Sequence, residues 1–398
     1  MYDVAIIGAG PVGLAFALSL AGAGLSIAIV ERQAEALLAD APFDGREIAL
    51  THHSRTVLEA LGAWDKLPTG SISPLRRAHV LNGRALHGLT FAPPVEDVDQ
   101  PLGFLVPNHL IRRALYACFK QTGGIRLIAG TALEKLAIGR DQALLRLAGG
   151  ETVTAKLAVA ADTRFSEARK SQGIGAVVHD FKRSMLVCRM THEAPHLETA
   201  TEWFDYGQTA ALLPVNGRIS SVVITRSGAE IERLKSLPDA AFEAEMQQGL
   251  AGRKLGMLRL VSTRHAYPLV ATYAHRFAAA RFALIGDAAV GMHPVTAHGF
   301  NLGLSGADTL ARELSAAGVE AGLGGALRRY ESSHRRATFP LFAGTNAIAE
   351  LYSKESTPAR IARHAIIGLG FALPPARRAI AAMLTDKREA GLTTALGR

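Results

Sequence analysis

Three glycines near the start of the chain have the type and spacing to hold a phosphate. Gly8, Gly10 and Gly13 form a Gly-x-Gly-x-x-Gly pattern between an apolar run and a helix-like stretch. Gly8 permits a tight turn, Gly10 lets the backbone approach a pyrophosphate, and Gly13 lets helix and strand pack closely. Because the N-terminus of a helix carries partial positive charge, we expect this turn to bind the pyrophosphate of a dinucleotide.

An acidic residue follows at the distance such a site requires. Glu31 ends the next apolar run, about twenty residues after the glycines, where its carboxylate can accept hydrogen bonds from both hydroxyls of an adenosine ribose. A carboxylate there repels a 2′-phosphate, so NADP is not expected at this site. NAD and FAD both remain open on this unit alone.

A segment far along the chain distinguishes FAD from NAD as the expected cofactor. Phe282–Ile285 reads as a strand that ends in Gly286-Asp287, and a loop through Pro294 then leads to Gly299 and Asn301. Asp287 can bond a ribityl hydroxyl, and the backbone after it can direct N–H groups at a flavin pyrimidine ring and phosphates. NAD needs no such second site, so the sequence predicts bound FAD. We expect no metal site, because no set of histidines and carboxylates recurs on one face.

Several predicted elements must position these residues. Residues 3–8 and 26–31 read as strands around a helix at 10–24, and further strands at 152–161 and 282–285 precede a helix at 302–317. Alternating segments at 184–190, 209–215 and 219–226 predict a second sheet, with Asn216-Gly217 turning a hairpin. From Leu327 onwards the pattern is helical, with Pro340, Pro358 and Pro374-Pro375 expected as breaks.

The predicted fold class is therefore α/β, with a βαβ opening, an inserted mixed or antiparallel β-sheet and a helical C-terminus. We expect a discontinuous FAD-binding domain in residues 1–75, 100–180 and 270–345. The predicted substrate-binding β-sheet region comprises residues 76–99 and 181–269. Residues 346–398 form the expected C-terminal helical segment.

The combined motifs resemble the flavoprotein monooxygenases that include p-hydroxybenzoate hydroxylase. Within that group, residues 293–304 (HPVTAHGFNLGL) and 44–50 (DGREIAL) are most similar to the ubiquinone-biosynthesis hydroxylases. The resemblance implies a glutathione-reductase-type FAD-binding fold. It also implies that Arg46 lies beside the cofactor, that Arg112 reaches its pyrophosphate or ribityl chain, and that Asp162 belongs to a second fingerprint. A surface position for either arginine is the alternative.

Three positions depart from the family pattern. Thr163 replaces the glycine that normally follows Asp162, Ala297-His298-Gly299 replaces Gly-Gln-Gly, and Gly306 replaces an acidic residue, with Asp308 two positions later. The second departure places an imidazole near the expected flavin ring.

The resemblance implies a reaction in which NAD(P)H, docking transiently, reduces the flavin and O₂ then supplies an oxygen atom to an aromatic ring. His298 and Pro294 are the catalytic candidates, because a neutral imidazole can help deprotonate a phenol and the proline lines the flavin side. The substrate side is expected in the inserted sheet, with these candidates: Trp203, Phe204, Tyr206 and Leu213. The favoured substrate is a polyprenylated phenol or quinol of ubiquinone biosynthesis. A hydroxylase of a small soluble aromatic acid and a flavin-binding assembly protein without turnover are the alternatives.

Composition and charge limit the possible partners and the cellular compartment. The net charge is +9, but the basic residues are scattered, so no nucleic-acid partner is expected. The two cysteines, Cys118 and Cys188, suggest no disulfide framework and fit a reducing cytoplasm. Residues 361–384 alternate apolar stretches with arginines, which predicts either peripheral contact with the inner membrane or contact with quinone-biosynthesis protein partners through the C-terminal helices. Packing of this segment on the protein's own core is the alternative.

Overall fold

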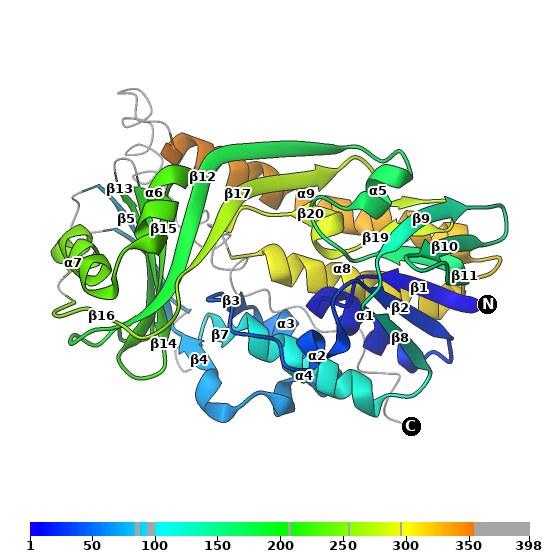
Figure 1. Cartoon of the computed structure of the whole chain (residues 1–398), viewed down its shortest axis with the longest axis horizontal. Helices are drawn as coiled ribbons and strands as arrows, with labels where there is room; N and C mark the ends of the chain where they lie inside the picture. The colour runs from blue at the N-terminus through cyan, green and yellow to red at the C-terminus, as the bar shows by residue number, and fades with distance from the viewer. Residues whose placement is uncertain (84–87, 94–99, 206–207, 254, 295–296, 354–398) are drawn as a thin grey trace.

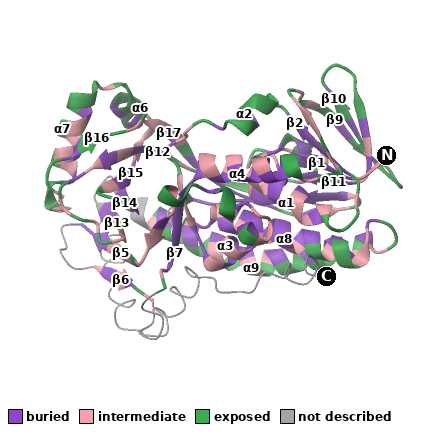
Figure 2. Ribbon diagram, turned by 90° about the horizontal axis from the view of Figure 1, so that it is seen from below, coloured by how far each residue is buried: buried purple, intermediate pink, exposed green. Residues whose placement is uncertain are grey.

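The computed structural model describes residues 1–83, 88–93, 100–205, 208–253, 255–294 and 297–353. Two sheets lie at opposite ends of the molecule, joined by long strands and with helices packed between and around them (Figure 1). The buried side chains concentrate where helices meet the first sheet and on the helix-covered face of the second (Figure 2).

The first sheet is built on parallel strands in the order β19-β11-β1-β2-β8. Its strands are β1 Tyr2–Ile7, β2 Ile27–Glu31, β8 Ile125–Ala129, β11 Thr152–Ala160 and β19 Phe282–Leu284, and the antiparallel strands β9 Leu133–Ile138, β10 Ala143–Leu147 and β18 Ala278–Ala279 extend it. Every residue of β2 is buried, as expected for a parallel strand covered on both faces.

Helices on both sides of this sheet fix its strand ends. The described helices are α1 Pro11–Ala21, α2 Glu35–Ala39, α3 His52–Ala60, α4 Asn108–Gln121, α5 Glu167–Ser171, α6 Gly228–Ser236, α7 Asp239–Gly249, α8 Gly299–Ala317 and α9 Leu323–Ser353. Helix α1 packs against α4 and α8, so the glycine turn and the helix that follows the Gly-Asp motif share one core.

The second sheet has the order β20-β17-β12-β15-β14-β13-β5-β6, with β16 beside β12. Its strands are β5 Arg77–Asn82, β6 Leu89–Phe91, β12 Ala176–Thr191, β13 Thr199–Asp205, β14 Gln208–Val215, β15 Ile219–Ser227, β16 Arg259–Leu260, β17 His265–Ala274 and β20 Val290–Gly291. All its pairs are antiparallel except β13 with β5. A small sheet of β3 Glu47–Leu50, β7 Gly103–Pro107 and β4 Ser73–Leu75 lies between the two.

The architecture confirms the predicted α/β class, the βαβ opening and the inserted sheet, and the Asn216-Gly217 hairpin joins β14 to β15. The expected limit at residues 180/181 falls inside β12, beside a register shift and the positive φ of Lys182. The limit at 269/270 falls inside β17, so both limits cut through long strands of the second sheet.

The prediction that Pro340 breaks the C-terminal helix was wrong. Helix α9 runs through it from Leu323 to Ser353. A proline removes one backbone hydrogen bond, but Tyr330 and His334 before it and Phe342 after it are buried, so packing on both sides sustains the helix. The expected breaks at Pro358 and Pro374-Pro375, and most of the segment 346–398, lie outside the described residues.

Candidate active site

The strand ends that carry the motifs meet at one edge of the first sheet. Strands β1, β11 and β19 are parallel neighbours, so Ile7, Ala160 and Leu284 end side by side. A Cβ added at Gly286 would lie 3.3 Å from the side chain of Val12, and one at Gly303 would lie 3.0 Å from it. The first turn of α1 therefore contacts both the Gly-Asp turn and helix α8.

The glycine turn has the geometry that a pyrophosphate needs. Gly8 has a φ of +109°, and a Cβ there would lie 2.7 Å from the carbonyl oxygen of Ala161. A Cβ on Gly13 would overlap the carbonyl oxygen of Gly8, whereas the space beside Gly10 is open to at least 4 Å. The structure thus leaves room at Gly10, the residue before helix α1.

Glu31 lies at the end of β2 with its carboxylate turned towards the same turn. Its oxygens accept backbone hydrogen bonds from Ala9 at 2.7 Å and from Gln33 at 2.8 Å. Each carboxylate oxygen has a second lone pair, so Glu31 can still accept bonds from ribose hydroxyls.

Arg46 and Arg112 lie in one neighbourhood beside this edge. Arg46 pairs with Asp44 at 2.6 Å and lies over the ring of Tyr267, with 43% of its side chain exposed. Burial alone would raise the pKa of Asp44, but the charge of Arg46 and hydrogen bonds from Arg46 and Asn108 hold it below its ordinary value. Burial lowers the pKa of Arg112, against the opposing charges of Asp44 and Glu31. Both arginines therefore have acidic partners close by.

Asp162 follows β11 and is adjacent to Gly8 in space, because a Cβ on Gly8 would lie 3.1 Å from its Cα. Its Oδ1 is buried and has no hydrogen-bond partner among the described residues, and burial raises the pKa of this carboxyl. Thr163 does not need the conformational freedom of glycine here, since its φ is not positive and its side chain accepts a hydrogen bond from the N–H of Phe165. This departure leaves an ordinary turn.

Asp287 has a partner that the sequence did not reveal. Arg164 donates a hydrogen bond to its carboxylate at 2.9 Å, and the Asp287 side chain remains 38% exposed. Arg169, which is buried, donates to the carbonyl oxygens of Ala288 and Arg164 and so ties the two strand ends together. No local signal in the sequence marked this ion pair, because Arg164 and Asp287 lie 123 positions apart.

The loop before α8 holds the other candidates. His298 is buried at the N-terminus of α8, Gly299 begins the helix, and Pro294 is exposed. Asn301 accepts a hydrogen bond from the N–H of Thr51 at 3.2 Å and donates to the carbonyl oxygen of Ala49 at 2.8 Å. The protein backbone thus already uses the Asn301 amide to fix this loop against β3.

The remaining departures also have local explanations. Ala297 adopts a positive φ of +52°, the conformation that glycine would adopt most easily. A Cβ on Gly306 would lie 2.7 Å from the imidazole of His334, so helix α9 packs where a longer side chain would collide. Asp308 is buried and pairs with Arg312 at 3.2 Å within α8. Burial also lowers the pKa of His293, aided by the charges of His179 and Arg164, to about 4.

The structure divides the proposed substrate residues. Trp203 packs in the core beneath α6 and α7 and donates a hydrogen bond to the carbonyl oxygen of Gly83, so its assignment to the substrate side was wrong. Phe204 and Leu213 alternate with members of that core and lie on the opposite face of the sheet. Tyr206 lies outside the described residues.

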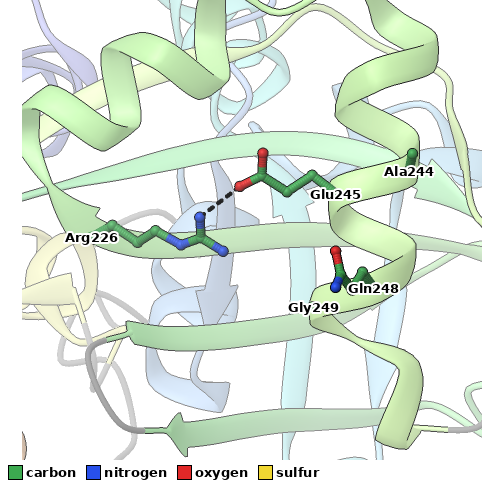
Figure 3. Close-up of a pocket in the computed structure, with 5 residues that line it drawn as sticks. All are labelled: Arg226, Ala244, Glu245, Gln248 and Gly249. Atoms are coloured by element: carbon green, nitrogen blue, oxygen red, sulfur yellow. Dashed lines mark hydrogen bonds and ion pairs between the residues drawn. The ribbon is translucent and has the colours of Figure 1, made fainter.

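A hollow of about 400 Å³ occurs on the α7 side of the same sheet (Figure 3). It is lined by residues of β15 and α7, among them Arg226 and Glu245, which form an ion pair at 2.8 Å. Arg226 lies on the strand face of Val222 and Ile224, which belong to the core under the helices. The sheet therefore separates this charged hollow from the flavin motifs.

Residues 1–340 match the model of a protein family described as an FAD binding domain. The chain belongs to this family. Among curated relatives, "Ubiquinone hydroxylase UbiM" of Neisseria meningitidis is 43% identical, over 96% of this chain and 84% of that protein. "Ubiquinone hydroxylase UbiL" of Rhodospirillum rubrum is 34% identical, over 94% of this chain and 87% of that protein. The chain is an FAD-dependent hydroxylase of this family.

Solved structures agree with this family at the level of the fold. The p-nitrophenol 4-monooxygenase PnpA from Pseudomonas putida has a TM-score of 0.78 at 17% identity, covering 98% of this chain and 99% of that one. A single-residue variant of HpxO from Klebsiella pneumoniae, complexed with FAD, has a TM-score of 0.74 at 17% identity, covering 96% of this chain and 97% of that one.

The described residues of this FAD-binding chain fit the cofactor. The open space at Gly10 adjoins the α1 N-terminus, the buried Asp162 oxygen lacks a partner among the described residues, and Glu31 retains acceptor capacity. Carboxylates and backbone N–H groups are the partners that ribityl and ribose hydroxyls and a pyrophosphate use. The site is thus suited to a dinucleotide whose two ends lie near Glu31 and near Asp287.

Proposed function

We propose that this FAD-dependent hydroxylase adds a hydroxyl group to the aromatic ring of a polyprenylated phenol or quinol in ubiquinone biosynthesis. The observation that carries the proposal is the similarity of nearly the whole chain to relatives named as ubiquinone hydroxylases, at 43% and 34% identity. When bound, FAD supplies the redox chemistry, taking electrons from NAD(P)H and activating O₂. The protein must hold the substrate ring and exclude water.

The proposed roles of the cofactor residues follow from the site geometry. Gly8, Gly10 and Gly13 shape the pyrophosphate turn, Glu31 accepts from the adenosine ribose, and Asp287 accepts from the ribityl chain. Arg46 and Arg112, which lie beside Asp44, are assigned to balancing the charge of the phosphates. Gly286, Gly299 and Asn301 shape the loop on the flavin side, with Pro294 and His298 as the candidates nearest the ring.

One observation favours the prenylated substrate over a small aromatic acid. A substrate carboxylate needs an unpaired cation in its pocket, and the described sheet face that carries Phe204 and Leu213 also carries Arg189. Arg189 is already paired with Glu47 at 2.5 Å, and the side chain of Glu47 is only 1% exposed. Its charge is therefore neutralised within the protein.

A lipid-soluble substrate makes contact with a membrane surface useful. No helix within the described ranges is long and apolar enough to cross a bilayer. The segment proposed for peripheral membrane contact or for quinone-biosynthesis partners lies mostly at 354–398, outside the described residues. Sedimentation of the full chain with anionic vesicles, compared with a chain ending at residue 353, tests this role.

The function itself is tested with the purified, FAD-loaded protein. We expect NADH or NADPH oxidation to accelerate with phenols that carry a short prenyl tail, and mass spectrometry to find a product heavier by one oxygen atom. Oxidation that yields only H₂O₂, or faster turnover of a benzoate than of every prenylated phenol, would contradict the proposal.

A further inference from the structure

The two faces of the second sheet differ in what covers them. Helices α6 and α7 pack on one face, over a core of alternate strand residues, for example Leu81, Trp203, Leu212 and Val222. Figure 1 shows these helices on the side away from the FAD-binding sheet. Because side chains alternate along a strand, the residues between them occupy the inner face.

Contacts of β12 and β17 show which segment packs against the inner face of the second sheet. Arg189 pairs with Glu47, the Tyr267 hydroxyl donates to the carbonyl oxygen of Asp44 at 2.7 Å, and His265 contacts the ring of Phe43. These partners lie in the segment that carries Arg46 and leads into β3. The inner face is thus turned towards the proposed flavin site.

Glu202 is the acidic residue on this inner face of β13, between Thr201 and the core residue Trp203. Its neighbours by register are Val80 on β5 and Ala211 on β14. It makes no hydrogen bond or ion pair with the described residues, yet it keeps part of its surface accessible to solvent. It also lies deep among protein atoms, and burial raises the pKa of Glu202 to about 8. A carboxyl that is both enclosed and accessible is positioned to meet a ligand.

The same face carries a buried polar group that lacks a partner among the described residues. Ser221 of β15 is fully buried, and its hydroxyl has no hydrogen-bond partner in the described part of the chain. The register places it opposite Leu213 on β14, next to the Ala211–Val223 pair that leads to Glu202. Buried polar groups in folded proteins normally have partners, so the unpaired Ser221 hydroxyl supports a ligand on the face that also carries Glu202.

We propose that Glu202 binds the ring hydroxyl of the aromatic substrate and accepts its proton. This inference rests on the proposed function for the reaction that follows. The substrate O–H bond breaks, a new O–H bond forms on the Glu202 carboxylate, and the electron pair stays on the substrate oxygen. No electrons are exchanged with another reactant. The resulting phenolate makes the ring carbon a better acceptor for the oxygen atom.

Among the described inner-face residues of β5, β13 and β14, Glu202 is the ionisable one. By register, the described inner-face residues beside it on β5 and β14 are uncharged: Ala78, Val80, Asn82, Thr209, Ala211 and Leu213. The charged groups that the register places on this face of β12 and β17 are Arg183, Arg189 and His265. They are three or four strands away, and Arg189 is paired with Glu47. Burial is the cause acting on the carboxyl.

The reaction provides one test, using the FAD-loaded protein and a prenylated methoxyphenol. We expect kcat/KM of the wild type to rise with pH, to reach half its maximum near pH 8 and to level off above pH 9, as the carboxylate forms. Glu202→Gln should lower kcat about 100-fold or more and remove this pH dependence, since proton transfer by a positioned side chain contributes roughly 10²–10⁴-fold. Glu202→Asp should be slower than wild type and retain the pH dependence. Glu232→Gln, on the exposed side of α6, is the matched control and should behave as wild type.

Binding provides a second test that does not require turnover. A nitrophenol is titrated into the same proteins and its phenolate absorbance is followed from pH 6 to pH 10. Above pH 8 the ionised Glu202 repels a phenolate, so wild-type affinity should fall about tenfold per pH unit while Glu202→Gln keeps its affinity. Equal pH profiles for these two proteins, with flavin content unchanged, would overturn the role of Glu202. A wild type that shows this binding profile but hydroxylates no phenol would overturn the proposed function instead.

Discussion

Gly10→Ala should weaken FAD binding without lowering folding stability, because the space beside Gly10 is open in the protein. Gly10 has φ −65° and ψ 174°, which alanine adopts without strain, and nothing lies within 4 Å of an added Cβ. At the position before a helix, alanine stabilises the folded protein less than glycine does, by less than about 1 kcal/mol. Alanine also lowers the conformational entropy of the unfolded chain, which stabilises the folded protein by about 0.4–1 kcal/mol and offsets that loss. The melting temperature of the flavin-free protein should therefore stay close to that of the wild type.

FAD binding should nevertheless weaken strongly. The methyl group occupies the space through which a phosphate approaches the backbone N–H groups of the turn. A hydrogen bond to a charged group contributes about 1.5–3 kcal/mol, so losing one raises the Kd for FAD about 10- to 150-fold. Quenching of FAD fluorescence on titration with flavin-free protein measures this Kd.

Two glycine variants bracket the result. Gly123→Ala, also with open space around it and far from the motifs, should change neither quantity. Gly13→Ala places a Cβ against the backbone oxygen of Gly8, so both folding stability and FAD affinity should fall. If Gly10→Ala binds FAD as tightly as Gly123→Ala, the pyrophosphate does not lie at this turn.

Three further predictions follow from the same contacts. Glu31→Gln retains one acceptor oxygen for two backbone N–H groups, so it should cost about 1–3 kcal/mol in urea unfolding of the flavin-free protein and weaken FAD binding; an unchanged unfolding midpoint would contradict the two bonds described. Asn301→Leu leaves the Thr51 N–H and the Ala49 carbonyl without their partner, so the unfolding midpoint should fall and the bound-flavin spectrum should shift, unlike in Gly123→Ala. Burial lowers the pKa of His334 to about 4, against about 6.5 in the unfolded chain, so the stability from this neutral imidazole is present above pH 6.5 and lost as pH falls towards 4. His334→Gln should lose less stability than wild type between pH 7 and pH 4.5, and an equal loss would show that His334 does not carry this dependence.

The cofactor motifs were readable from the sequence because each is local. The turn at Gly8 and the strand end at Asp287 each combine a strand, a turn and a helix within some twenty residues, and the parallel order of β1, β11 and β19 then brings them together. The ion pair of Arg164 with Asp287 was not readable, because it joins residues 123 positions apart. The continuous helix through Pro340 was also missed, since local preference predicts a break and only the packing of α9 overrides it.

Substrate recognition is harder to read because it depends on the face to which each strand residue points. Trp203 and Glu202 are adjacent, and a slip of one residue in the register of β13 would exchange their faces. That register depends on pairing across β5, β13, β14 and β15, and on which face α6 and α7 cover. The sequence predicts Trp203 as a substrate residue, yet Trp203 packs in the core under α6 and α7. The neighbouring Glu202 lies on the opposite face of the sheet, which is turned towards the FAD-binding segments. We therefore expect substitutions at alternate positions of these strands to change substrate choice without loss of bound FAD.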